Sequence, residues 1–244
     1  MNITSSYQLT ILVPVYNEAD NMERLEATLS AYLPHATVPS CILFVNDGST
    51  DNSLLLIRNI CRRQAHFYYI SYAQNRGLST ALKAGIDTVE SNYVGYIDAD
   101  LQTDPEDFNK LLAYVSEYPL VMGIRAQRND SWGKRLQSRF ANTFRRFMTG
   151  DTATDTGCPL KIMWTSHARR LPAFNGMHRF LPALMMLQDA PFKEIPVRHY
   201  PRMAGQSKYH LWNRLFGPLA DCFGYRWLRK RYISYQFSDH NLNP

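Results

Sequence analysis

The sequence contains little cysteine, and its cysteines are scattered. Among its 244 residues there are four, Cys41, Cys61, Cys158 and Cys222, and no two of them form a Cys-x-x-Cys pair. This spacing argues against a disulfide framework and against a zinc site built from paired cysteines. Because the cysteines stand mostly in apolar surroundings, we expect reduced core thiols, which fit a reducing cytoplasm best.

Long apolar runs are also missing. No stretch reaches the roughly 18 uncharged apolar residues that a membrane-spanning helix needs. The N-terminal stretch "MNITSSYQLT" has neither the basic region nor the apolar region of a signal peptide. We therefore expect a chain without a signal peptide and without a membrane span.

Composition indicates a folded, basic protein. The hydrophobic share of 45% is enough for a sizeable core in one large domain or two small ones. The formal net charge is +6 and the sequence pI is about 9.1. The basic excess is concentrated in residues 125–146 and 226–231, which favours phosphates or anionic lipid as partners.

Strand-like and helix-like stretches alternate along the chain. Short, nearly all-apolar stretches predict strands buried on both faces at residues 9–16, 41–47, 67–72, 93–100 and 120–126. Amphipathic stretches predict helices over 18–33, 50–64 and 104–118, with Asp104 as the cap of the last one. This order predicts an α/β fold whose mostly parallel sheet is flanked by helices and binds ligands beyond the carboxyl ends of its strands.

Polar residues follow three of these strands, in "VPVYNEADN", "VNDGSTDNS" and "DADLQ". The first two are explained equally well as a helix start and an ordinary capped turn. Asp98 and Asp100 are harder to explain in that way, because neighbouring carboxylates repel each other unless a cation or ligand donors compensate. A hard divalent ion with open positions for substrate phosphates would do so, and Gln102 could add a carbonyl oxygen.

Ordered blocks along the chain carry a family resemblance. They are "VPVYNEADN", "VNDGSTDNS", "NRGLSTALKAG", "YIDADLQTDPED", "GIRAQRNDSWGKRLQSRFAN", "DTGCPLK" and "RMAGQSKY". In order and approximate spacing they resemble family 2 glycosyltransferases, in particular the branch of dolichyl-phosphate mannosyltransferase and bacterial polyprenyl-phosphate glycosyltransferases. The resemblance extends from about residue 9 to 210. It implies a GT-A fold and transfer of a sugar from GDP-mannose or a UDP-hexose to a polyprenyl or dolichyl phosphate at the cytoplasmic membrane face.

The resemblance also implies roles for residues on the donor side. The implied nucleotide-sugar pocket consists of Pro14, Tyr16, Glu18, Asp47 and Asp98. Within it, Asp47 would accept a hydrogen bond from the base. The implied metal ligands are Asp98, Asp100 and Gln102, which would hold Mg²⁺ or Mn²⁺ against the donor diphosphate.

The implied acceptor-phosphate site lies later in the chain. It consists of Arg125, Arg128, Lys134, Arg135, Ser138, Arg202, Ser207 and Lys208. A basic run more often marks a solvated face, but arginine suits bidentate phosphate binding, and in relatives the "RMAGQSKY" loop closes over the site. Asp155 stands where the family has a carboxylate near the acceptor, with a turn or cap as its structural alternative. It completes the implied catalytic set with Asp98 and Asp100. Pro159 and Leu160 depart from the family pattern, which often has Gly or Ser and then an aromatic residue.

The acceptor's chemistry indicates the mechanism. A phosphate oxygen is already anionic near neutral pH, so it needs positioning more than deprotonation. We therefore expect direct inverting displacement without an obligatory general base. His178 in "GMHRFLPALMML" is interpreted as a structural hydrogen-bonding residue, and the neighbouring Arg179 as a candidate for binding an anion.

Three alternatives remain open at this stage. A glycosyltransferase that acts on a sugar hydroxyl in polysaccharide or lipid-glycan synthesis could share the fold, although the QxxRW-type motif of such synthases is missing from the sequence. The glycine-rich, lysine-containing signature of nucleotidyltransferases is also missing. A nucleic-acid-binding module could use the basic patches, but it would leave the two aspartates unexplained, so we expect no nucleic-acid partner.

The C-terminal stretch combines aromatic and basic residues. Residues 209–237 contain both types throughout, and Gly217 with Pro218 is expected to break the stretch into two pieces. Such residues favour a membrane interface, and the alternative is a terminal helix packed on the core with its cations in water. We expect a catalytic domain over 1–210 and a membrane-interface segment over 211–244. The enzyme would bind the inner face of the membrane peripherally from the cytoplasm, or dock on a membrane-protein partner.

Overall fold

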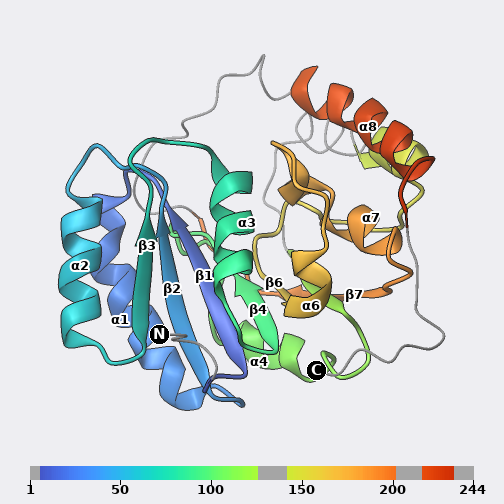
Figure 1. Cartoon of the computed structure of the whole chain (residues 1–244). Helices are drawn as coiled ribbons and strands as arrows, with labels where there is room; N and C mark the ends of the chain where they lie inside the picture. The colour runs from blue at the N-terminus through green and yellow to red at the C-terminus, as the bar shows by residue number, and fades with distance from the viewer. Residues whose placement is uncertain (1–5, 126–141, 202–215, 234–244) are drawn as a thin grey trace, which may run out of the picture.

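A seven-stranded sheet forms the centre of the molecule (Figure 1). The structure, a computed structural model, describes residues 6–125, 142–201 and 216–233. The strands are β1 (Leu9–Val15), β2 (Ser40–Asn46), β3 (Phe67–Ser71), β4 (Tyr93–Tyr96), β5 (Leu120–Arg125), β6 (Lys161–Trp164) and β7 (Phe192–Val197). Their order is β3-β2-β1-β4-β6-β5-β7. Only β6 runs antiparallel to its neighbours β4 and β5, so the sheet is mostly parallel, as predicted.

Helices cover both faces of this sheet. Those against one face are α1 (Met22–Tyr32), α2 (Ser53–Arg63) and α4 (Asp107–Leu112). Those against the other face are α3 (Leu78–Thr88), α6 (Thr165–Arg169), α7 (Leu181–Met186) and α8 (Phe216–Arg229), together with a helix over 142–149. The short 3₁₀ turns are η1 (Ala19–Asn21), η2 (Leu33–His35) and η3 (Met177–Arg179).

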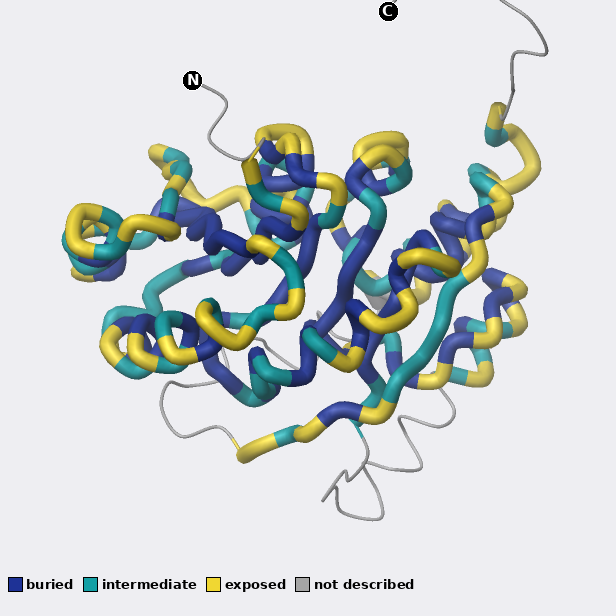
Figure 2. The backbone as a smooth tube through the Cα atoms, turned by 90° about the horizontal axis from the view of Figure 1, so that it is seen from below, coloured by how far each residue is buried: buried dark blue, intermediate teal, exposed yellow. Residues whose placement is uncertain are grey.

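The core is divided by the sheet into two apolar clusters. Alternate residues of β1 point to opposite faces, so Ile11 belongs to the cluster that includes residues of α1, α2 and α4, whereas Leu12 belongs to the cluster that includes residues of α3, α7 and α8. Figure 2 shows the dark blue, buried strands between helices whose outer sides are exposed. Burial on both faces explains why the central strands are almost entirely apolar. Both clusters hold the carboxyl ends of the strands at one edge.

Two predicted elements are shorter than expected. β4 ends at Tyr96 rather than at residue 100, and α4 covers Asp107–Leu112 rather than 104–118. Helix α4 starts late because a turn precedes it. In this turn the Asp107 and Phe108 amides donate to the Asp104 and Pro105 carbonyls at 3.0 and 2.9 Å. Asp104 Oδ1 accepts from the Glu106 amide at 3.0 Å. Asp104 therefore caps this turn, and the prediction that it caps the helix itself was wrong.

The cysteines fit the prediction of free core thiols. Cys41, Cys158 and Cys222 are buried, Cys61 is half-buried, and all four are free. Burial raises the pKa of the Cys41 and Cys61 thiols to about 11. Because the thiolate is the reactive form, these side chains act as small apolar groups.

Helix α8 packs one of its faces against the rest of the protein. Its Tyr225 hydroxyl donates to the Ala183 carbonyl at 2.8 Å, and its ring stacks on Phe180 with centroids 6.2 Å apart. The helix is continuous, with Gly217 and Pro218 in its first turn, where proline is compatible with a helix. Because residues 202–215 lie outside the described ranges, the predicted break between two pieces at Gly217 and Pro218 stays a prediction. None of the helices in the described ranges is long and apolar enough to cross a membrane.

Candidate functional site

Strand register brings the polar strand ends together. Val15 at the end of β1 pairs with Asn46 at the end of β2, and the Asp47 amide donates to the Val15 carbonyl at 2.8 Å. β4 is parallel to β1 on its other side, with Leu12 opposite Tyr96. Because these strands are parallel, the residues after β1, β2 and β4 share one sheet edge. This edge, with the end of β5, is the candidate site.

The loops after β1 and β2 hold each other through side chains. Asn17, which has a left-handed backbone with φ of 52°, accepts from the Thr50 amide at 2.7 Å and donates its own amide to Ser49 Oγ at 3.0 Å. The Glu18 amide donates to Ser53 Oγ at 2.9 Å, and its carboxylate accepts from Asn21 Nδ2 at 2.7 Å. The polar residues of this stretch thus have a clear structural role. Pro14, Tyr16 and Glu18 are half-buried here, beside the end of β1.

Asp47 sits in a cradle of donors. Its Oδ1 accepts from the Arg76 amide at 2.7 Å, and its Oδ2 accepts from the Gly77 amide at 2.8 Å and from Asn75 Nδ2 at 2.9 Å. Gly77 caps the N-terminus of α3, so the carboxylate also lies where that helix is positive. Two oxygens have about four acceptor positions, and three are used here. Donors from the described residues therefore hold the Asp47 carboxylate in one orientation.

The residues after β4 form a tight acidic turn. Leu101 adopts a left-handed backbone with φ of 51°, which is uncommon for a residue with a branched side chain. The Gln102 amide donates to Asp100 Oδ1 at 3.2 Å, and Arg24 on α1 donates to the Asp100 carbonyl at 2.8 Å. The Tyr96 hydroxyl donates to Asp98 Oδ1. The strained backbone of Leu101 is therefore held by contacts on several sides, as is common at binding sites.

The donor set of this turn suits a hard divalent cation. It offers carboxylates from Asp98 and Asp100 and the amide oxygen of Gln102, which are ligand types that Mg²⁺ and Mn²⁺ prefer. Gln102 is also paired with the segment after β7, because the Tyr200 amide donates to the Gln102 carbonyl at 2.8 Å. Within the described ranges, no group of three His, Cys, Asp or Glu side chains is arranged to hold a metal. The site would thus supply two carboxylates and a neutral oxygen and leave positions for phosphate oxygens.

Arg125 and Asp155 form a bidentate ion pair beside this turn. Arg125 Nε donates to Asp155 Oδ2 at 2.7 Å, Nη2 donates to Oδ1 at 2.6 Å, and the Arg125 amide donates to Oδ2 at 3.2 Å. The side chains are only 19% and 10% exposed. Asp155 therefore orients the guanidinium at the end of β5, and the two residues must be considered as one unit.

Several predicted acceptor residues lie outside the described residues. These are Arg128, Lys134, Arg135, Ser138, Arg202, Ser207 and Lys208. Two further arginines of the same basic run are described, and neither fits a solvent-facing phosphate site. Arg145 is buried in an ion pair with Asp151 and donates to the Ala153 carbonyl at 2.7 Å, and Arg146 donates to the same carbonyl at 2.9 Å. These two arginines hold the chain around residues 151–153.

His178 contacts a helix that borders the site. Its Nδ1 lies 2.8 Å from Ser79 Oγ on α3, and Ser79 Oγ also accepts from the Gly176 amide at 2.9 Å. Burial is the largest cause that lowers the pKa of His178, to about 3, and Arg179 and Lys161 add to this effect. The imidazole is therefore neutral, which agrees with the structural interpretation. Arg179 lies 3.7 Å from Asp221 on α8.

Three residues of this region carried no role in the sequence-based prediction. Arg24 reaches the acidic turn from α1, Tyr96 contacts Asp98, and Lys161 lies buried between the turn and the loop of Asp155. A lone lysine between apolar residues in "CPLKIMW" was the available signal for Lys161. Tyr96 and Arg24 look like ordinary members of a strand and an amphipathic helix.

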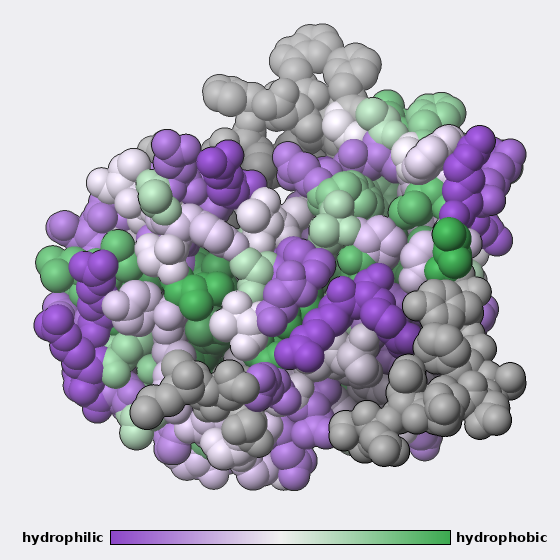
Figure 3. Space-filling view, viewed as in Figure 1, coloured by the Kyte–Doolittle hydropathy of each residue, from purple (hydrophilic) through white to green (hydrophobic). Residues whose placement is uncertain are grey.

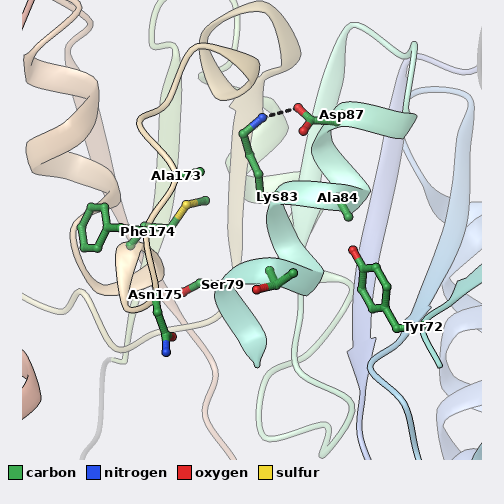
Figure 4. A pocket seen from close by; sticks show the side chains of 10 residues that line it. Tyr72, Ser79, Lys83, Ala84, Asp87, Ala173, Phe174 and Asn175 are labelled. Atoms are coloured by element: carbon green, nitrogen blue, oxygen red, sulfur yellow. Dashed lines mark hydrogen bonds and ion pairs between the residues drawn. The ribbon is translucent and has the colours of Figure 1, made fainter. Parts of the chain in front are cut away.

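A cavity of about 320 Å³ lies apart from the acidic turn, between α3 and residues 173–177. Figure 4 shows Tyr72 and Phe174 on opposite sides of it and the Lys83–Asp87 ion pair above. None of the site residues predicted from the sequence lines it. We therefore assign the site to the strand ends and not to this cavity.

A mostly parallel α/β sheet with an Asp-x-Asp turn beside the end of its first strand defines the GT-A class of glycosyltransferases. The chain belongs to glycosyl transferase family 2, whose sequence profile matches residues 10–171. The family and the fold expected from the sequence are thereby confirmed.

Curated bacterial relatives have names that refer to lipid phosphates. The chain is 31% identical over 226 residues to a dodecaprenyl-phosphate galacturonate synthase of Rhizobium johnstonii, covering 88% of this chain and 65% of the relative. It is 31% identical over 205 residues to an undecaprenyl-phosphate 4-deoxy-4-formamido-L-arabinose transferase of Edwardsiella ictaluri, covering 83% of this chain and 63% of the relative. The chain thus spans slightly less than two thirds of the length of these relatives.

A solved structure has the same fold. It is a mannosyltransferase of Pyrobaculum calidifontis in complex with GDP-Man and Mn²⁺, with a TM-score of 0.63 and 18% sequence identity. The match covers 92% of this chain and 64% of that chain.

Proposed function

We propose that the protein transfers a sugar from a nucleotide-sugar to a polyprenyl or dolichyl phosphate. The acidic turn with Asp98, Asp100 and Gln102 carries this proposal, because it lies on the same sheet edge as the Asp47 cradle. One ligand could therefore place a base near Asp47 and a diphosphate near the turn. The names of both bacterial relatives support a polyprenyl-type acceptor. The donor is GDP-mannose or a UDP-hexose.

A divalent cation, Mg²⁺ or Mn²⁺, completes the proposed donor site. When bound, it would neutralise the charge that the nucleoside diphosphate gains as it leaves. Asp98 and Asp100 would hold it with their carboxylates and Gln102 with its amide oxygen. The Mn²⁺ in the Pyrobaculum mannosyltransferase supports a metal of this kind.

The proposed reaction is a direct displacement. An acceptor phosphate oxygen attacks the anomeric carbon from the side opposite the diphosphate, and a new carbon–oxygen bond forms. The bond between that carbon and the diphosphate oxygen breaks, and the nucleoside diphosphate leaves with the electron pair, so the anomeric centre is inverted. Arg125, held by Asp155, would attract and orient the anionic acceptor. Arg128, Lys134, Arg135, Ser138, Arg202, Ser207 and Lys208 remain proposed members of the acceptor site.

A donor screen tests the proposed function. The unfolding temperature would be measured with GDP-mannose, UDP-glucose, UDP-N-acetylglucosamine and the free nucleoside diphosphates, each with Mg²⁺, with Mn²⁺ or with chelator. A ligand at a hundredfold excess over its dissociation constant stabilises the folded state by about 2.7 kcal/mol. We expect one nucleotide series to stabilise the protein only with a divalent ion. An unfolding temperature that no donor raises with either metal would contradict the proposal.

Replacing Asp155 with asparagine distinguishes a phosphate acceptor from a hydroxyl acceptor. With a phosphate acceptor we expect turnover within about tenfold of the wild type, because no proton has to be removed, whereas loss of a general base lowers rates by about 10²–10⁴-fold. Turnover at saturating donor and acceptor is the measurement. Near-complete loss would favour the alternative, transfer to a sugar hydroxyl.

The Asp155→Asn variant needs a stability control. Asp155 pairs with the half-buried Arg125, so the substitution weakens a bidentate ion pair. Its unfolding temperature must therefore be compared with the wild type, and activity must be measured well below the transition. A loss of activity that follows the loss of folded protein would say nothing about a base.

We also propose that α8 binds the inner leaflet of the membrane. Its outer side exposes Leu219, Phe223 and Trp227, which follow one another at intervals of four residues and are 39%, 62% and 59% exposed. Residues four apart lie on one side of a helix, so they form a row, the α8 apolar row. Arg231 packs over Trp227 at 5.2 Å from the ring centre. Figure 3 shows green, hydrophobic residues over α8 beside purple, hydrophilic residues near its end.

The opposite sides of α8 suit this role. Cys222 and Tyr225 are buried against the protein, so the helix is anchored, while the α8 apolar row faces outward. Basic residues near an anionic leaflet contribute about 1 kcal/mol each, and tryptophan settles at headgroup depth. A membrane-protein partner with an acidic, apolar surface is the competing occupant. An inner-leaflet position is consistent with a nucleotide-sugar donor made in the cytoplasm.

Serine at Phe223 and Trp227 tests the membrane surface. We expect the double variant to lose flotation with vesicles containing anionic lipid while its unfolding temperature stays near the wild-type value, because both side chains are exposed. Leu55→Ser is the matched control, since Leu55 is 57% exposed on α2. Unchanged flotation of the double variant would exclude the α8 apolar row as the membrane contact.

A further inference from the structure

Lys161 is buried at the junction of the acidic turn and the Asp155 loop. It is the first residue of β6, is only 1% exposed, and stands directly opposite Tyr96 in the antiparallel pairing of β4 and β6. Its Nζ donates to the Thr156 carbonyl at 3.3 Å and to the Cys158 carbonyl, and lies 5.7 Å from the centre of the Tyr96 ring. The side chain thus bridges β4 and the loop that follows Asp155.

These neighbours provide partners for the Lys161 amino group. An ammonium group has three donors, and here two carbonyls and one aromatic face accept them. Within the described ranges Lys161 forms no ion pair with a carboxylate. Burial lowers the pKa of Lys161, whereas the nearby Cys158, Asp155 and Asp98 act in the opposite direction. Lys161 therefore reaches the site through its contacts with Tyr96 and with the Thr156 and Cys158 carbonyls.

The two partners of Lys161 lead to the two halves of the site. The Tyr96 hydroxyl donates to Asp98 Oδ1, so the ring that covers the ammonium also orients a residue of the acidic turn. Lys161 also donates to carbonyls of the loop that begins at Asp155. Asp155 itself forms the bidentate ion pair with Arg125. A buried amino group is expensive to desolvate, and here two carbonyls and the Tyr96 ring compensate for that cost. The same contacts connect the Asp155 loop to Tyr96.

We propose that Lys161 is a positioning residue that fixes Tyr96, and through it the Asp98 carboxylate, in register with the Asp155 loop. This inference rests on the proposed function, in which Asp98 faces the donor diphosphate and Asp155 faces the acceptor. Because a single buried side chain contacts both halves, it sets the distance over which donor and acceptor meet. Small misplacement of reacting groups lowers turnover more than it lowers binding.

Tyr96→Phe and Lys161→Met test the chain of contacts from Lys161 through Tyr96 to Asp98, which we call the relay. Tyr96→Phe keeps the ring over the ammonium and removes only the bond to Asp98, so we expect the Mn²⁺ dissociation constant, measured calorimetrically with nucleoside diphosphate, to rise about tenfold. Lys161→Met should raise it similarly and should lower turnover at saturating substrates by about tenfold or more, with little change in the Michaelis constant for the acceptor. In the double variant the two effects on Mn²⁺ should not add, because both act through one contact.

Two comparisons separate positioning from plain stability. Lys193 lies 5.7 Å from the Tyr114 ring at the start of β7, away from the strand ends, so Lys193→Met makes the same chemical change without touching the relay. Lys161→Arg keeps the charge and should recover part of the Mn²⁺ affinity that Lys161→Met loses. If Lys161→Met does not fold, Tyr96→Phe alone decides.

The outcomes distinguish this proposal from the proposed function. Wild-type protein that binds no nucleoside diphosphate with either Mg²⁺ or Mn²⁺ would contradict the proposed function itself. Wild-type protein that binds, together with Tyr96→Phe and Lys161→Met variants that keep wild-type Mn²⁺ affinity and turnover, would overturn only the relay. The relay would also be overturned if Lys193→Met weakened Mn²⁺ binding as much as Lys161→Met does.

Discussion

Replacing Asp100 with asparagine is expected to reduce sugar transfer by about a thousandfold or more. The substitution keeps the size of a side chain that is 6% exposed and removes one of the two charges of the acidic turn. Without that charge the turn can no longer hold a divalent cation firmly, and stabilisation of the leaving diphosphate is lost. Transfer to polyprenyl phosphate and calorimetric binding of nucleoside diphosphate with Mn²⁺ are the measurements. Binding should become independent of the metal.

The fold should survive this change. Asp100 Oδ1 accepts from the Gln102 amide, and an asparagine oxygen can do the same. Removal of one carboxylate also relieves repulsion between Asp98 and Asp100. Asp87→Asn is the matched control, since Asp87 is exposed on α3 and pairs with Lys83 away from the turn. An Asp100→Asn variant that stays active in the presence of a chelator would refute the metal site.

The central strands could be predicted because burial on both faces leaves an apolar signature. β1 and β2 appear in the sequence as continuous apolar runs, and the structure places them within one residue of the predicted bounds. β7 carries Lys193, Glu194 and Pro196, as an edge strand can, so it lacks that signature. β6 has only four residues and starts with a lysine. Short strands and edge strands are therefore harder to predict from the sequence than long central strands.

Helix α3 shows how packing overrides local signals. It was not among the predicted helices, although its buried positions, such as Leu82 and Ile86, recur four residues apart. Its Gly85 lowers helix propensity, and the reason for that glycine is tertiary: a Cβ there would lie 2.8 Å from Leu12 Cδ1. Because α3 lies this close to β1, position 85 favours glycine, and glycine weakens the helical pattern in the sequence.

The sequence points to the candidate site where charge stands out against an apolar background. Asp98 and Asp100 follow a buried strand, and that contrast is visible in one sequence. The cradle of Asp47 was not visible, because the Arg76 and Gly77 contacts come from backbone amides that any residue would supply. The contact between Lys161 and Tyr96 depends on the antiparallel pairing of β4 and β6, which the pattern of parallel strands gave no reason to expect.

Gly48 occupies a place in the candidate site where no side chain fits. Its φ is +64°, and a Cβ atom would lie 2.3 Å from the Gln74 carbonyl carbon and 2.5 Å from the Asn75 nitrogen. Both are backbone atoms, so a rotamer change cannot relieve the clash. The loop that must move is the one that supplies the donors to Asp47. Gly48 thus connects the stability of this edge to the shape of the proposed nucleotide pocket.

Gly48→Ala is therefore expected to destabilise the protein by about 3 kcal/mol or more. The left-handed backbone alone costs about 1–2 kcal/mol with a Cβ, and each disturbed hydrogen bond to Asp47 adds about 0.5–1.5 kcal/mol. Denaturant unfolding measures the loss, and nucleoside diphosphate affinity should fall with it. Gly224→Ala on the exposed side of α8 has no described heavy atom within 4 Å of the new Cβ, so it should stabilise by up to about 1 kcal/mol. A Gly48→Ala variant with the wild-type unfolding midpoint and nucleotide affinity would show that the 74–77 loop can move away freely, and Asp47 would then not be held by it as we infer.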